Sequence, residues 1–244
     1  MLDKRNLFIV VAFITYFIIG AFLSITNGIS HDQYHEQLNW RVNFDAIKSL
    51  FNDDGGYERL LSYTDKYHGI AFHYFSQPIQ LLTNNFVEKI NFVNLEYANY
   101  ISRHLAVFIS FNIAGIFFYM LSIKLTDSKN FAVTATAVFL VYPYLFGHAQ
   151  INGKDIPFLT MWLICTYYFF TVVENLYNNK KIIFLDLFLI SFFSAFLISI
   201  RITGILILLE KILGLIILIN FNGVSSLKLM TASIMSKADS NFCL

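Results

Sequence analysis

The 244-residue chain is poor in charge, in proline and in cysteine. Charged residues make up 14% of it, against about 25% in an average soluble domain, and the formal net charge is +1. This balance gives no strongly basic or acidic surface, so nucleic acid is not an expected partner. The two cysteines, Cys165 in an apolar run and Cys243 in the tail, predict neither a disulfide nor thiol chemistry. The chain also lacks a G-x-G-x-x-G or P-loop motif, which argues against a nucleotide site.

Apolar residues take the place of the missing charge. They make up 57% of the chain, phenylalanine alone occurs 27 times, and the mean hydropathy is +0.59. Several runs approach or exceed 18 apolar residues, which predicts an all-α, polytopic membrane helical bundle. We expect about six spans, at roughly residues 7–26, 104–123, 130–147, 156–176, 182–200 and 202–221.

The first and last of these spans need separate comment. The first is too long for an ordinary signal peptide and no clean cleavage site follows it, so we interpret it as an uncleaved anchor. The last carries Glu210 and Lys211 near its middle. Each charge there costs about 2.5–3.5 kcal/mol on the insertion scale, so this span is the least secure.

Lysine and arginine in the short loops predict the orientation. With the N-terminus in the cytoplasm, the outer short segments hold only Lys154 and Arg201, and the inner ones hold Lys4, Arg5, Lys124, Lys129, Lys180, Lys181, Lys228 and Lys237. We therefore expect a multi-pass integral protein of the plasma (inner) membrane, with residues 27–103 as a large outer loop. Within it, Trp40, Phe44, Ile47 and Phe51 recur at helical spacing, which predicts an amphipathic helix lying flat on the membrane surface.

Ionisable residues gather where the predicted spans meet this outer face. Asp32, Arg103, Lys154, Asp155 and Arg201 come from four separate regions of the chain, and the topology brings all of them to one side. Acid and base at one depth indicate a site for an anionic ligand with a proton acceptor. Simpler interpretations stay open for each residue: a helix N-cap for Asp155, a turn cap for Asp32, and interfacial anchoring for the arginines.

Two histidines precede the amphipathic helix. His31 and His35 stand four residues apart, a spacing that suits a metal ion but lacks the H-E-x-x-H order of zinc proteases. Interfacial or structural histidines are the alternative. The sequence names no certain cofactor and leaves a divalent metal open.

Five segments together resemble a known family. They are "HDQYHEQ" (31–37), "YHGIAFHY" (67–74), "SRHLAVFISFNIAGIFFYML" (102–121), "YPYLFGHAQINGKDIPF" (142–158) and "SIRITGI" (199–205). The set is similar to the membrane glycosyltransferases of the GT-C fold, of the protein O-mannosyltransferase and aminoarabinose-transferase type (glycosyltransferase family 39). The resemblance covers about residues 5–210, and its motifs are short.

The resemblance implies a catalytic site. Asp32 matches the acid of the family's outer loop, the expected general base. Asp155 matches a second acid that orients the acceptor or helps to hold a metal or phosphate. Arg103 and Arg201 match basic positions that meet a sugar phosphate. The other residues expected to bind substrate are His104, Lys154 and Glu36. The family often has another acid directly after the first, where this chain has Gln33.

The implied reaction moves a sugar from a polyprenyl-phosphate donor to a hydroxyl of a glycan, lipid or protein acceptor at the outer face. Such a transfer needs a base and positive charge near the leaving phosphate. We expect residues 1–221 to form the catalytic region and residues 222–244 to be a tail without a domain. Because family members are longer, we also expect a truncated or frameshifted reading frame, and an inactive fragment of such an enzyme is one alternative. The rival interpretations are a transporter or flippase-like protein that binds an anionic lipid, and a structural membrane subunit.

Overall fold

The computed structural model describes residues 4–52, 54–178 and 180–222, and it contains only helices and their connections in these ranges. The first four helices are α1 (Lys4–Thr26), α2 (Gln33–Asn52), α3 (Gly56–Ser62) and α4 (Ala71–Asn91). After them come α5 (Leu95–Thr126), α6 (Lys129–Val141), α7 (Pro143–Ile151), α8 (Asp155–Tyr177), α9 (Phe184–Ile200), the short 3₁₀ helix η1 (Ile202–Ile205) and α10 (Leu206–Asn222). The predicted all-α class is confirmed for this part of the chain.

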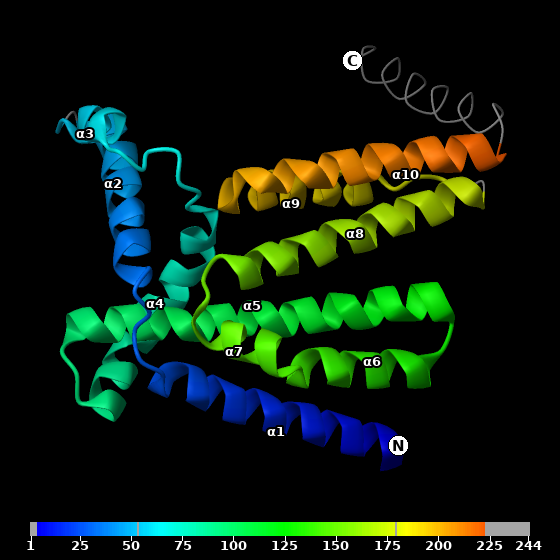
Figure 1. Cartoon of the computed structure of the whole chain (residues 1–244), viewed down its shortest axis with the longest axis horizontal. Helices are drawn as coiled ribbons and strands as arrows, with labels where there is room; N and C mark the ends of the chain where they lie inside the picture. The colour runs from blue at the N-terminus through cyan, green and yellow to red at the C-terminus, as the bar shows by residue number, and fades with distance from the viewer. Residues whose placement is uncertain (1–3, 53, 179, 223–244) are drawn as a thin grey trace, which may run out of the picture.

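The long helix α5 is the centre of the bundle (Figure 1), and it packs against α1, α4, α6, α7 and α8. Its buried face supplies much of the main core, through Ala106, Val107, Phe108 and Phe111. Helix α1 approaches closely at Gly20, where an added Cβ would overlap the Phe108 ring. Small residues allow this kind of close backbone approach between apolar helices, whose association depends on van der Waals packing.

Three helices are long and apolar enough to cross a membrane: α1 from Asn6, α5 and α8. A fourth candidate is the pair α6 and α7, which is bent by 58°. The bend falls where Pro143 begins α7, because proline cannot continue the hydrogen-bond ladder of the preceding helix. Helix α9 is apolar but has only 17 residues. By length and composition, the described residues therefore hold three or four candidate spans, against the six expected from the sequence.

The expected outer segment forms three helices at one end of the bundle, with α2 running across the direction of α5 in Figure 1. The predicted amphipathic helix is present as α2, and Gly55, the N-cap residue of α3, lies in the left-handed region at φ 75°. Apart from Trp40, the predicted apolar stripe is exposed: Phe44, Ile47 and Phe51 point away from the protein, together with Leu50. The buried face of α2 is mostly polar, so α2 uses polar contacts to dock on the bundle.

Successive connections between the long helices lie at alternate ends of the bundle (Figure 1). One end gathers the C-terminus of α1, the start of α5, the α7–α8 turn and the end of α9 (Figure 1). The other end holds the α5–α6 turn and the C-terminus of α8, which Lys124 and Glu174 join by an ion pair of 2.5 Å. Which end faces the cytoplasm stays a prediction. Of the predicted tail 222–244, all residues after Asn222 lie outside the described residues.

Candidate functional site

A buried ion cluster lies where α2 meets the bundle. The Glu36 carboxylate stands 2.6 Å from Nη1 of Arg103 and 3.6 Å from Nζ of Lys154. The side chains of Glu36 and Arg103 are only 7% and 5% exposed, whereas that of Lys154 is 23% exposed. One buried carboxylate thus neutralises a buried guanidinium and also meets a second, more accessible cation. A buried charge would be strongly unfavourable without such a partner.

The α7–α8 turn positions Lys154 over this cluster. The side-chain oxygen of Asn152 accepts hydrogen bonds from the backbone N–H groups of Lys154 and Asp155, at 3.1 and 2.8 Å. At Gly153, an added Cβ would stand 2.9 Å from Nη2 of Arg103 and 3.2 Å from a carboxylate oxygen of Glu36. The turn can therefore lie directly on the Glu36–Arg103 pair only because it has no side chain at this position.

A second ion pair lies beside the first and is open to solvent. Arg201, which follows α9, places Nη1 2.5 Å from the Asp155 carboxylate, and both side chains are nearly half exposed. The amide of Asn152 donates to the same carboxylate at 2.8 Å. Asp155 is the first residue of α8, the N-cap position belongs to Lys154, and the backbone N–H of Asp155 donates to the side chain of Asn152. The N-cap interpretation of Asp155 is therefore wrong.

Two histidines, His68 before α4 and His73 in α4, lie near the ion pairs. Burial and the nearby Lys154 lower the pKa of His68. Its neighbour Gly69 lies against the carbonyl groups at the end of α9, where no side chain would fit. His73 is buried and stacks on Trp40 of α2, with ring centroids 5.4 Å apart. Burial, and then the positive charge of Arg103, lower the pKa of His73 to about 2, so this ring is neutral at physiological pH.

His104 has a different environment from the one expected of a substrate-binding residue. It is fully buried, and its Nδ1 stands 3.1 Å from the carbonyl oxygen of Ser24. Its Nε2 meets the side-chain amide of Gln33. Because that amide donates, the network places the ring proton on Nδ1, which donates to Ser24. His104 thus ties together α1, α2 and α5.

The structure does not bring Asp32 into the ion cluster. Its side chain is 83% exposed and lies 3.9 Å from Nδ1 of His31, one helical turn before Glu36. His31 and His35 are also exposed, with ring centroids 6.3 Å apart. Among the described residues, no group of three or more histidine, cysteine or acidic side chains is placed to hold a metal ion. Of the predicted site residues, Glu36, Arg103, Lys154, Asp155 and Arg201 are the five that lie together.

No family model, no curated protein and no solved structure matches this chain. The resemblance to the GT-C glycosyltransferases therefore remains an interpretation of short motifs. What the chain does has to be argued from the geometry of the ion cluster and its surroundings.

Several residues of the site were not predicted. Asn152 stands three residues before Asp155 and directly before a glycine, a pattern typical of an asparagine that caps its own turn. Gln33, which we noted only for the acid it replaces, bonds a buried histidine. His68 and His73 lie in "YHGIAFHY" (67–74), one of the segments that carry the family resemblance, but no role was predicted for either histidine. Only the packing of α4 against α2 and α5 places them here.

Proposed function

We propose that this chain is a membrane glycosyltransferase that uses a sugar linked to polyprenyl phosphate and acts at the end of the bundle carrying the ion cluster. In this proposal α9 and α10 are also spans, so the chain crosses six times, and the ion cluster faces outward. The single observation that carries the proposal is the pair of adjacent ion pairs, one buried and one half exposed, at the mouth of an apolar bundle.

The charge balance of this site favours a phosphate. Arg103, Lys154 and Arg201 supply three positive charges, while Glu36 and Asp155 supply two negative ones, so one positive charge is left over. The more accessible cations are Lys154 and Arg201. An arginine fork fits phosphate oxygens in two-point contact, and a lysine adds a point charge. A polyprenyl tail would lie in the bilayer beside the apolar helices, with its phosphate at this depth.

The proposed reaction is an inverting displacement. The acceptor hydroxyl oxygen forms a bond to the anomeric carbon of the sugar. The bond from that carbon to the phosphate oxygen breaks, and its electron pair leaves with the polyprenyl phosphate. The hydroxyl proton passes to a carboxylate, and Asp32 is our candidate because it is exposed and not paired with a strong base. Asp155 holds Arg201 toward the leaving phosphate, where positive charge stabilises the transition state.

Sugar transfer in membranes containing the full chain tests this proposal. The donor is the endogenous polyprenyl-phosphate pool with radiolabelled sugars, and the variants are matched for expression. We expect Asp32→Asn to lower transfer at least 100-fold, as removal of a general base does. The matched control is Asp127→Asn, which makes the same change at the opposite end of the bundle, at a left-handed position (φ 53°) that asparagine accepts.

The other outcomes decide between the rival interpretations. Equal transfer by wild type and Asp32→Asn would remove Asp32 from the mechanism. A second outcome is that neither the wild type nor any variant transfers sugar, while the wild type retains polyprenyl phosphate. If Arg201→Met abolishes this retention, the protein binds an anionic lipid and is not a transferase. If neither transfer nor retention occurs in a correctly inserted chain, the proposed donor site is wrong.

A further inference from the structure

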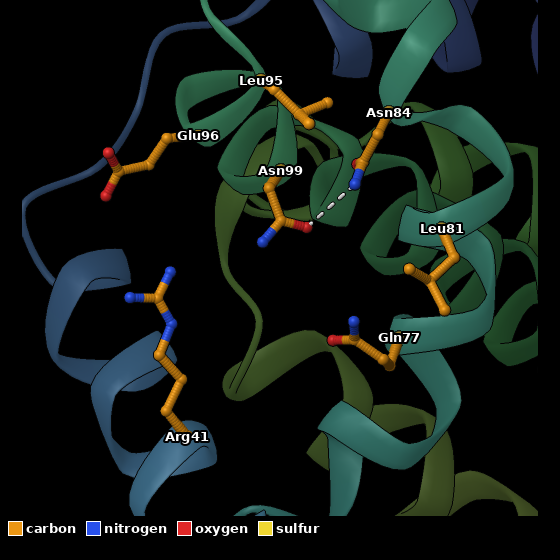
Figure 2. A pocket seen from close by; sticks show the side chains of 7 residues that line it. All are labelled: Arg41, Gln77, Leu81, Asn84, Leu95, Glu96 and Asn99. Carbon is orange, nitrogen blue, oxygen red and sulfur yellow. Dashed lines mark hydrogen bonds between the residues drawn. The ribbon is translucent and has the colours of Figure 1, made fainter.

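A cavity that contains no residue of the ion cluster lies between α2, α4 and α5 (Figure 2). It measures about 500 Å³, which is within the usual range of small-molecule sites. Three of its seven lining residues carry side-chain amides: Gln77, Asn84 and Asn99. Arg41 and Glu96 stand on one side of the opening, and the apolar Leu81 and Leu95 complete the lining.

The amides are held in place but keep unused hydrogen-bonding capacity. The Asn84 amide donates to the side-chain oxygen of Asn99 at 3.2 Å, and Gln80 donates to the backbone carbonyl of Asn99 at 2.8 Å. The side-chain oxygens of Gln77 and Asn84 are buried, yet find no hydrogen-bond partner among the described residues. Burying an amide oxygen without a partner costs about 1–3 kcal/mol. Atoms of this kind call for a hydrogen-bond donor, such as a water molecule or a ligand.

The cavity adjoins the ion cluster. On α5, Asn99 precedes Arg103 by one helical turn, and on α4, Gln77 follows His73 by one turn. One turn of four residues advances about 6 Å along a helix. Two helices that line the cavity therefore lead directly to the ion cluster, so ligands at the two places would lie end to end.

We propose that this amide cavity binds a neutral, hydroxyl-rich ligand, namely a glycosyl unit of the acceptor. The proposal rests on the proposed function and names its acceptor class. Amide groups both donate and accept, as sugar hydroxyls do. Leu81 and Leu95 offer apolar surface to the C–H face of a sugar ring. Glu96 and Arg41 lie on the same side of the opening and balance each other in charge, so the cavity has no positive excess to attract a phosphate, in contrast to the ion cluster (Figure 2).

Direct binding to the full-length chain in detergent micelles tests the cavity. The chain contains two tryptophans, and Trp162→Phe leaves Trp40, the neighbour of Arg41, as the only tryptophan, which can be excited selectively over the tyrosines. The probes are tetrasaccharides of glucose, N-acetylglucosamine and mannose, with inorganic phosphate as the anionic probe. We expect a saturable fluorescence change with at least one tetrasaccharide. We expect no fluorescence change with phosphate that depends on the residues of this cavity.

Two variants and one control make the test specific. Gln77→Met keeps the length of the side chain while removing the amide, and should raise the Kd for the sugar at least tenfold. Arg41→Met should raise the Kd for the sugar by a smaller factor. Because Arg41 is exposed, we expect this variant to fold even if Gln77→Met fails to fold. Lys48→Met, an exposed cation lost from the same helix, should leave the Kd unchanged.

The proposal fails if no tetrasaccharide binds, if both Gln77→Met and Arg41→Met bind as the wild type does, or if phosphate binds in a manner that depends on Arg41. These results are separable from failure of the proposed function. Sugar binding that is sensitive to Gln77→Met, without any transfer from the donor pool, would support the cavity and reject the transferase. If sugar transfer occurs and Gln77→Met leaves the KM for the acceptor unchanged, the transferase would be supported and the cavity rejected as its acceptor site.

Discussion

Burial separates two carboxylates that stand only four residues apart in the chain. Asp32 is almost fully exposed, whereas Glu36 is buried between Arg103 and Lys154. The two acids therefore have different tasks. Glu36 neutralises charge inside the protein and holds α2 against α5, while Asp32 is accessible from the solvent. Loss of each carboxylate should accordingly affect different properties.

We expect Glu36→Gln to destabilise the protein by about 3–5 kcal/mol, because it leaves Arg103 buried without its counter-charge. Asp32→Asn should change stability by less than about 0.5 kcal/mol, as surface substitutions usually do. Thermal unfolding in detergent, followed by tryptophan fluorescence, measures both. The double variant Glu36→Gln/Arg103→Met should recover part of the loss, and equal stability of Glu36→Gln and wild type would contradict the structural role of this pair.

At the scale of elements, the connection between α7 and α8 decides the form of the site. Asn152 accepts hydrogen bonds from the backbone of the turn, Gly153 lies on the Glu36–Arg103 pair, and the next two residues, Lys154 and Asp155, enter ion pairs. A turn of three residues thus connects the N-terminus of α8 with α2, α5 and the end of α9. Such a close approach leaves no room for a side chain in the middle of the turn.

Two glycines near this turn offer a matched comparison. Gly153→Ala should cost about 1–3 kcal/mol, since the new methyl group overlaps Arg103. Gly147→Ala, within α7, meets nothing within 4 Å and should stabilise the helix by about 0.5–1 kcal/mol. Unfolding midpoints of the two variants measure the difference. If Gly153→Ala proved as stable as Gly147→Ala, or more stable, the turn would not lie on the ion pair as described.

At the scale of the whole molecule, the helices divide the chain into two polar ends around an apolar middle. The end with α2, α3 and α4 carries both the ion cluster and the amide cavity. The exposed Phe44, Ile47, Leu50 and Phe51 of α2 lie at this end too. This arrangement suits a helix that docks through polar residues and turns its apolar side chains toward the membrane surface.

The orientation can be measured by labelling single cysteines in intact cells with a membrane-impermeant maleimide. In a Cys243→Ser background, in which the remaining Cys165 is buried, Asp54→Cys tests the end with the ion cluster and Asn130→Cys tests the other. We expect labelling of position 54 without permeabilisation, and of position 130 only after it, because the basic loops favour the cytoplasm. The reverse pattern would invert the topology and exclude an outward-facing site.

The sequence by itself determined the class of the fold. Long apolar runs need helices in a bilayer, because each backbone polar group must find its partner within the segment. The same runs, with their intervening loops, brought Arg103, Lys154, Asp155 and Arg201 to one end of the bundle.

Only the tertiary structure decided how these residues are paired. The sequence could not distinguish Glu36 from Asp32, because burial depends on which side of α2 faces α5. It did not predict α4, whose packing creates both the histidine surroundings of the ion cluster and the amide cavity. It also did not predict the break at Pro143 as a bend of 58°. Composition and periodicity act along one segment, whereas these features arise from contacts between segments far apart in the chain.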